Sequence, residues 1–149
     1  ACYYLHIDGT PEGGLYGGAW CPDSAMLRNI RKAIVDNIEE FEAIVNDPAM
    51  HEAFPQWYCN MLKTVPKGYD RDHPQAQYLR MKDYGRFAPT DPKLFCDPAW
   101  PEIVAERFSQ VQPFVEFINY SLDEERSITQ TGQTGPTRLT CLTLSWPPP

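Results

Sequence analysis

The chain has 149 residues and a mass of 17.1 kDa, enough to bury a hydrophobic core within one domain. Apolar residues make up 42% of it, which excludes a disordered chain, and no apolar run approaches the ~20 residues that cross a bilayer. The net charge of -7 argues against nucleic-acid binding, because that function needs a basic surface to displace phosphate counterions.

The cysteines indicate neither a zinc site nor a disulfide scaffold. They lack the paired spacing of zinc ligands, and an odd number at low density is unlike a small secreted domain. The predicted setting is the reducing cytoplasm, also because no signal peptide is expected ahead of the first strand. If the chain begins with a hairpin, Cys2 and Cys21 are expected opposite each other as small buried side chains. The five are Cys2, Cys21, Cys59, Cys96 and Cys141.

The start of the chain predicts a β-hairpin. Residues 2–8 and 15–21 are rich in aromatic and β-branched side chains, and residues 9–14 form a glycine-containing turn. If Asp8 lies opposite Leu15, Tyr4 pairs with Ala19 and His6 with Gly17, which leaves room on that face for a helix or a ligand. The other face is then the core face, with Tyr3, Leu5, Ile7, Tyr16 and Trp20.

Helical spacing and capping residues predict most of the remaining elements. Asp23 or Ser24 is the expected cap of the first helix, and Asp47-Pro48 begins the second. The predicted elements are an amphipathic helix over 24–45, a short helix over 48–54, a strand over 59–65, a polar loop over 66–74, a helix from about Asp72 to Met81, a strand over 84–88, and helices beginning at Asp91-Pro92 and Trp100-Pro101.

The last helix is expected to be long. Its apolar stripe keeps its phase across Pro113, so the proline is expected to kink the helix rather than end it. Together these elements predict an α+β fold, in which an antiparallel hairpin or small sheet packs against several helices. The stripe consists of Val104, Phe108, Val111, Val115, Ile118 and Leu122.

The composition changes near residue 126. Residues 127–149 contain one charged side chain, Arg138, and end in three prolines. We therefore expect one domain over residues 1–126 and a flexible or non-native tail over 127–149, since order is least expected at termini. The alternative is that residues 139–146 add a strand.

One stretch has the composition of a binding site. Residues 63–86 hold six basic against three acidic side chains in a chain that is otherwise acidic, a pattern that favours anions. The loop Pro66–Pro74 also precedes a predicted helix, whose free backbone N–H groups attract anions. The expected ligand-binding donors are Lys63, Lys67, Arg71, Arg80 and Lys82.

His73 is the candidate acid–base group of this site. A carboxylate from Asp70 or Asp72 could orient its imidazole, which titrates near neutral pH. The structural alternative is a solvated turn in which Lys67 and Arg71 pair with the two aspartates, Asp72 caps a helix and His73 bonds its own turn. The spacing of the histidines predicts no metal site, and no phosphate-loop or dinucleotide motif predicts a cofactor.

Four segments of the chain have a familiar sequence pattern: YYLHI (3–7), GGLYGGAWCP (13–22), LKTVPKGYDRDHP (62–74) and VQPFVEFIN (111–119). Together they resemble one uncharacterised family, domain of unknown function 2461. The resemblance covers about residues 2–123 and implies an α+β domain in the cytoplasm, without implying an activity or a catalytic residue. Family members usually carry a further segment upstream, so this chain is expected to expose apolar surface and to self-associate.

Two functions follow from these patterns. The first is binding of a small anionic ligand, bearing phosphate or carboxylate, through the Lys67–Pro74 loop, with or without catalysis by His73. The second is a non-enzymatic protein-interaction or self-association module that uses an exposed sheet face with its aromatic side chains. Neither function involves nucleic acid or a membrane.

Overall fold

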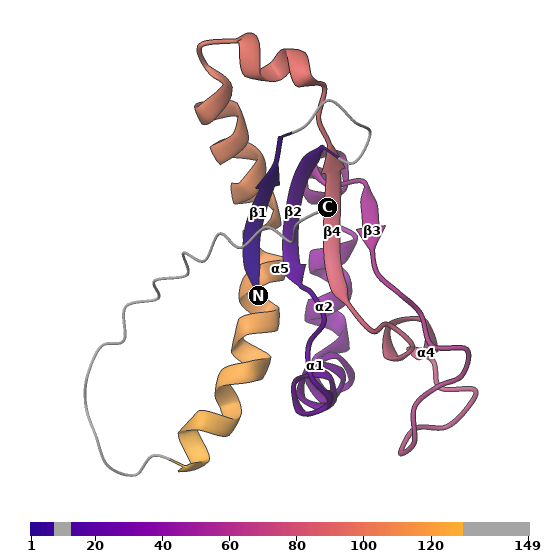
Figure 1. Ribbon diagram of the computed structural model, residues 1–149. Helices are drawn as coiled ribbons and strands as arrows, with labels where there is room; N and C mark the ends of the chain where they lie inside the picture. Colours follow the sequence, from indigo (N-terminus) through magenta and orange to yellow (C-terminus); the bar gives the residue numbers. More distant parts are fainter. Residues whose placement is uncertain (8–12, 130–149) are drawn as a thin grey trace, which may run out of the picture.

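A four-stranded antiparallel sheet forms the centre of the computed structural model, which describes residues 1–7 and 13–129 and, within them, the side chains up to residue 122. The strand order is β1-β2-β4-β3. Figure 1 shows α1, α2 and α5 behind the sheet, while the face toward the viewer carries none of these helices. The elements are β1 Cys2–His6, β2 Gly14–Ala19, α1 Ser24–Asp36, α2 Ile38–Val45, α3 Pro48–Ala53, β3 Gln56–Tyr58, α4 Ala76–Leu79, β4 Tyr84–Pro89, the 3-10 helix η1 Pro92–Cys96, and α5 Trp100–Thr129. This arrangement confirms the predicted α+β fold with a long C-terminal helix.

The hairpin forms as predicted, but in another register. Leu5 lies opposite Leu15, where the prediction placed Asp8. A shift by an odd number of residues turns one strand's side chains to the other face of the sheet. The predicted core face was therefore wrong: Tyr16 shares its face with Tyr4 instead of Tyr3, and Ile7 is 55% exposed.

The other hairpin pairs change with the register. Tyr4 lies opposite Tyr16, His6 opposite Gly14 and Cys2 opposite Gly18. The predicted Cys2–Cys21 pair was also wrong, because both thiols are free and exposed. The predicted turn falls largely on residues 8–12, which lie outside the described residues.

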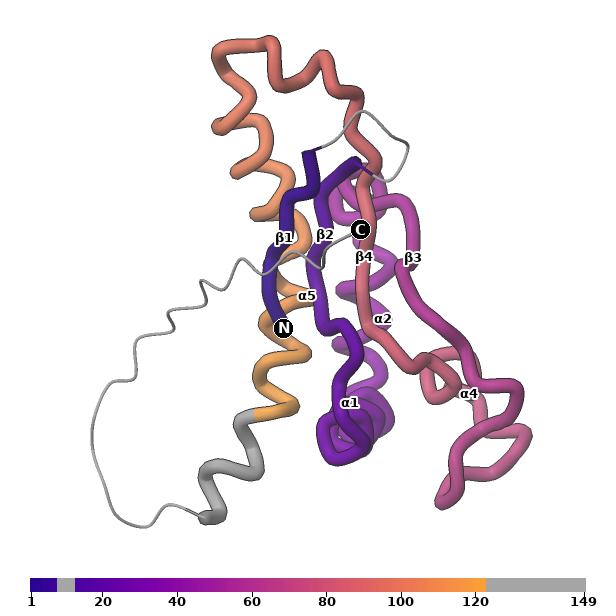
Figure 2. The backbone as a smooth tube through the Cα atoms, in the orientation of Figure 1, coloured from indigo at the N-terminus to yellow at the C-terminus, as the bar shows by residue number. Residues whose placement is uncertain are grey.

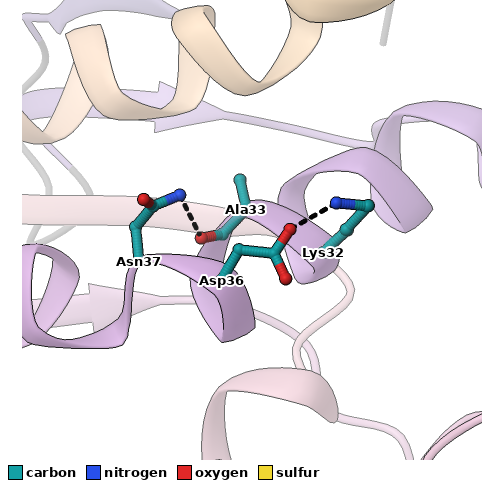
Figure 3. Close-up of polar contacts among 4 residues, drawn as sticks. All are labelled: Lys32, Ala33, Asp36 and Asn37. Carbon is teal, nitrogen blue, oxygen red and sulfur yellow. Dashed lines mark hydrogen bonds and ion pairs between the residues drawn. The ribbon is translucent and has the colours of Figure 1, made fainter.

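The helix predicted over residues 24–45 is divided at Asn37. Asp23 caps α1 by accepting hydrogen bonds from the backbone N–H groups of Ala25 and Met26, at 2.8 and 2.9 Å. At the other end the Asn37 side chain donates to the Ala33 carbonyl, beside the Lys32–Asp36 ion pair (Figure 3). Asparagine side chains compete in this way with helical backbone bonds, and α2 starts anew at Ile38.

Three other boundaries differ from the predictions. The strand predicted over 59–65 lies earlier in the chain, at Gln56–Tyr58, because these are the residues that pair with β4. The helix predicted from Asp72 is the single turn Ala76–Leu79, and its N-cap is Gln75, without a side-chain cap bond. The helix predicted at Asp91-Pro92 is a short 3-10 helix.

Helix α5 forms as predicted and continues through Pro113. Its stripe lies against the sheet, with Val111, Phe114 and Ile118 fully buried. No helix in the described part of the chain has both the length and the apolar character to cross a bilayer. Of the predicted tail 127–149, only the backbone up to residue 129 is described, as the end of α5.

Helix α5 packs closely against the sheet at Gly17 in β2. A β-carbon built on Gly17 would lie 2.9 Å from Cγ1 of Val111, closer than side chains pack. Val111 is β-branched and has one preferred rotamer in a helix, so rotating its methyl groups away from position 17 is unfavourable. The absence of a β-carbon at position 17 therefore allows the helix to lie this close to the sheet.

We predict that Gly17→Ala lowers the free energy of unfolding by about 1–3 kcal/mol, because it overpacks this contact. Adding Val111→Ala makes room for the methyl group added at position 17. The loss of unfolding free energy in the double variant is therefore expected to be about 1 kcal/mol smaller than the sum of the losses in the two single variants. Urea denaturation of the three variants and the unchanged protein measures this coupling. Strictly additive costs would show that the two residues do not limit the packing.

Candidate functional site

The loop Pro66–Pro74 is an exposed turn structure. It belongs to the connection between β3 and α4 that projects from the body of the domain in Figure 2. Lys67 and Arg71 are exposed, as are Asp70 and Asp72. Gly68 takes a left-handed conformation, with φ of 99°, which favours glycine. Nothing packs within 4 Å of a β-carbon built there, so this segment lies open to solvent.

His73 makes its contacts within its own turn. Its Nδ1 accepts a hydrogen bond from the backbone N–H of Gln75 at 3.1 Å. Its ring meets that of Tyr69 edge-on, with centroids 5.7 Å apart. Within the described residues the imidazole makes no hydrogen bond to Asp70 or Asp72. Asp72 does not cap α4, whose N-cap is Gln75.

The structure distributes the predicted cations along the chain and does not gather them in one cavity. Arg80 donates from Nε to the Leu62 carbonyl at 2.8 Å, while Lys63 and Lys82 are exposed. None of the five lines any of four well-formed cavities in the part of the chain that the structure describes. Lys63, Lys67 and Arg71 nevertheless form no ion pair with any described residue, so their charges are available to a ligand.

The open face of the sheet carries a cluster of aromatic rings, which we call the aromatic face. Tyr16 is at its centre, with ring centroids 4.6 Å from Phe87, 5.3 Å from Tyr58 and 5.8 Å from both Tyr4 and Trp20. The β-pairing explains the cluster, because Tyr4, Tyr16 and Phe87 are directly opposite one another on three adjacent strands. Such edge-on and tilted contacts between rings are favourable.

A hollow of about 380 Å³ lies on this aromatic face. Tyr4 and Tyr58 on its rim are 50% and 47% exposed. The Tyr4 hydroxyl lies 3.3 Å from Nδ1 of His6, and none of the aspartate, glutamate, lysine or arginine side chains that the structure describes lines the hollow. This surface can therefore take up a neutral partner with apolar or hydroxyl-bearing groups. Its lining is Cys2, Tyr4, His6, Tyr16, Trp20 and Tyr58.

Sequence reasoning found these rings but grouped them wrongly. It assigned Tyr16 and Trp20 to the core and placed Tyr58 outside any strand. The presence of glycine at positions 14 and 18, on the same face of β2 as Tyr16, was the available signal. Strand faces with several glycines are poorly filled by their own side chains, which leaves space for rings from the neighbouring strands.

Asp83 joins the segments that follow β2 and β3, just after Trp20 and Tyr58. Its buried carboxylate accepts from the backbone N–H groups of Cys21 and Asn60 at 2.8 and 3.2 Å, and from the Asn60 side-chain amide at 2.8 Å. Burial alone would raise the pKa of Asp83, but the bonds from Asn60 and Cys21, helped by nearby Lys82, outweigh it and lower that pKa. The charged form thus stabilises one end of the aromatic face.

The described residues include no cluster of three or more histidine, cysteine or acidic side chains placed to hold a metal ion. Comparison with protein families gives one match, to the model of a conserved hypothetical protein, DUF2461, over residues 1–117. No curated protein and no solved structure matches the chain.

Asp83 predicts an acid-dependent loss of stability. Because folding lowers its pKa below the unfolded value of about 3.9, its contribution is present above that pH and is lost as the pH falls through the folded-state pKa. Asp83→Asn should cost about 1–3 kcal/mol at pH 6 and should weaken the dependence of stability on pH below 4. Urea denaturation between pH 6 and 3 measures both effects, with exposed Asp70→Asn as the control. An equally steep acid dependence in Asp83→Asn would contradict this role.

Proposed function

The chain belongs to DUF2461, a family of conserved hypothetical proteins whose description names no activity, so we propose its function from the surface features of the domain. We propose that the domain is a non-enzymatic interaction module that binds a second copy of itself through the aromatic face. The observation that carries this proposal is an aromatic surface with a hollow on the sheet face that no helix covers (Figure 1). The four free cysteines in the described chain fit a reducing, cytoplasmic setting.

The chemistry of the aromatic face favours protein contact. Tyrosine and tryptophan are enriched in interfaces because they combine a large apolar ring with one hydrogen-bonding group. The rings of Tyr4 and Tyr58 are about half exposed. Excluding water from them at an interface lowers the free energy of the complex. An exposed apolar patch of this kind is characteristic of interaction sites.

Charge and strand exposure favour a second copy as the partner. Two copies with a net charge of -7 each repel each other overall, but no acidic or basic side chain within residues 1–7 and 13–122 lines the hollow. Strand β1 is an edge strand of the sheet. Its sequence, CYYLH, has no proline, lysine or arginine of the kind that protects natural edges from pairing with another chain.

We expect the unchanged protein to show a concentration-dependent molar mass that approaches a dimer in light scattering. Tyr4→Lys and Tyr58→Lys place charges on both sides of a symmetric contact, so each should weaken dimerisation by roughly 10–100-fold. Tyr120→Lys is the matched control, because Tyr120 is 78% exposed on α5 and lies outside the aromatic face. A monomer at all concentrations, or equal weakening by all three substitutions, would refute the proposal.

Anion binding at the Lys67–Pro74 loop is a second candidate, supported by the absence of ion pairs to Lys67 and Arg71 among the described residues. Lys67→Ala and His73→Ala should weaken the binding of inorganic phosphate, measured by NMR titration, by roughly 3–10-fold without lowering the melting temperature. Lys93→Ala, which removes an exposed lysine elsewhere, should leave binding unchanged. Equal effects at all three positions would indicate nonspecific screening.

A further inference from the structure

Arg86 is buried in the domain without a counter-charge. It lies in β4 and is 1% exposed. Its Nη2 donates to the Phe54 carbonyl at 2.6 Å, and its guanidinium carbon lies 4.6 Å from the ring centre of Trp57. Its Nε has no hydrogen-bond partner, and no carboxylate of the described chain forms an ion pair with it.

An arrangement of this kind is costly. Buried charges in proteins are normally paired, because removing a charge from water costs far more than one neutral hydrogen bond returns. The ring of Trp57 offsets part of the cost through a cation–π contact. Burial also lowers the pKa of Arg86, although a guanidinium remains charged at neutral pH. A missing anion would account for the arrangement.

Arg86 also lines a cavity of about 570 Å³ with space for a small molecule. This cavity lies among the end of α2, α3, β3 and the α4 region. Asn46, His51 and Gln77 bring hydrogen-bonding groups to it, and Trp57 and Tyr78 bring apolar surface. One charged residue of opposite sign, Glu42, also lines it. Small-molecule sites commonly combine such apolar walls with a few polar groups.

We propose that this cavity binds a small metabolite through a carboxylate or phosphate group, and that Arg86 is the principal ligand of that group. The planar guanidinium fork matches the two oxygens of either group. The single hydrogen bond to Phe54 leaves other N–H groups of the fork for the ligand. Glu42 restricts the ligand to one of low total charge, because a second anionic group near it would be repelled.

This site is distinct from the aromatic face. Arg86 pairs with Gly17 and Trp57 in the sheet, and Gly17 faces α5. Phe87, the next residue, belongs to the aromatic face. Because alternate side chains of a strand point to opposite faces, the cavity lies on the helix-covered side. A dimer formed through the aromatic face would therefore leave the cavity accessible, and the two proposals can fail separately.

The test is a thermal unfolding series with inorganic phosphate and with acetate, a monocarboxylate, each compared with sodium chloride at equal ionic strength. A ligand that binds the folded state alone raises the melting temperature in proportion to the logarithm of its concentration above saturation. At about 100 times the dissociation constant the expected rise is roughly 10 °C. A larger response to acetate identifies a carboxylate ligand, and a larger response to phosphate identifies a phosphate ligand.

Four variants show where on the domain the anion binds. Gln77→Glu adds a negative charge at the cavity while leaving the core intact, and should reduce the anion-dependent shift at least threefold. Gln110→Glu is the matched control at a residue that does not line this cavity, and Lys67→Ala tests the exposed loop. Arg86→Gln keeps a donor for the Phe54 carbonyl and should abolish the shift.

If Arg86→Gln fails to fold, Gln77→Glu still decides the question. The proposal is overturned if neither anion exceeds chloride, or if Gln77→Glu keeps the full shift. It is likewise overturned if Lys67→Ala alone removes the shift, since that result assigns binding to the loop.

Discussion

Helix α5 contacts β2 where Gly17 has no side chain, and this contact fixes which face of the sheet is buried. A β-carbon on Gly17 would come within 2.9 Å of Val111, so the helix lies as close as its backbone and valine side chains allow. Once this face is covered, Leu15, Ala19 and Ala88 become core residues. Alternation along the strands then directs Tyr4, Tyr16 and Phe87 to the open face.

The two faces of the sheet consequently have different chemistry. Among the described strand residues, Arg86 is the charged side chain of the covered face, and its charge is held by one carbonyl and one indole ring. The open face is a cluster of rings around Tyr16, and no described acidic or basic side chain lines its hollow. Apolar surface left open favours association with another protein, and an unpaired charge in a cavity favours a small charged ligand. The domain thus carries two separate candidate sites, one on each side of the sheet.

Buried hydrogen bonds from single side chains connect the regions around these sites. Asp83 joins the end of β2 to the segment after β3. Arg31 of α1 donates to the Met81 carbonyl at 2.8 Å, which holds the α4 region against the first helix. Buried polar groups that satisfy backbone partners specify one arrangement of the segments, because every other arrangement leaves them unsatisfied. Short loops near the sites are therefore fixed although they contain little regular structure.

The sequence by itself determined the fold class, the family and the helices whose apolar stripe is long, such as α5, because helical periodicity is local. It also identified the cap Asp47 and restricted the first cap to Asp23 or Ser24, because caps act within one turn. It did not determine the hairpin register, the break at Asn37 or the burial of Arg86. Only the tertiary structure decided those features, and with them the candidate sites, because the packing of α5 on Gly17 and the pairing of β2 with β4 join residues far apart in the chain.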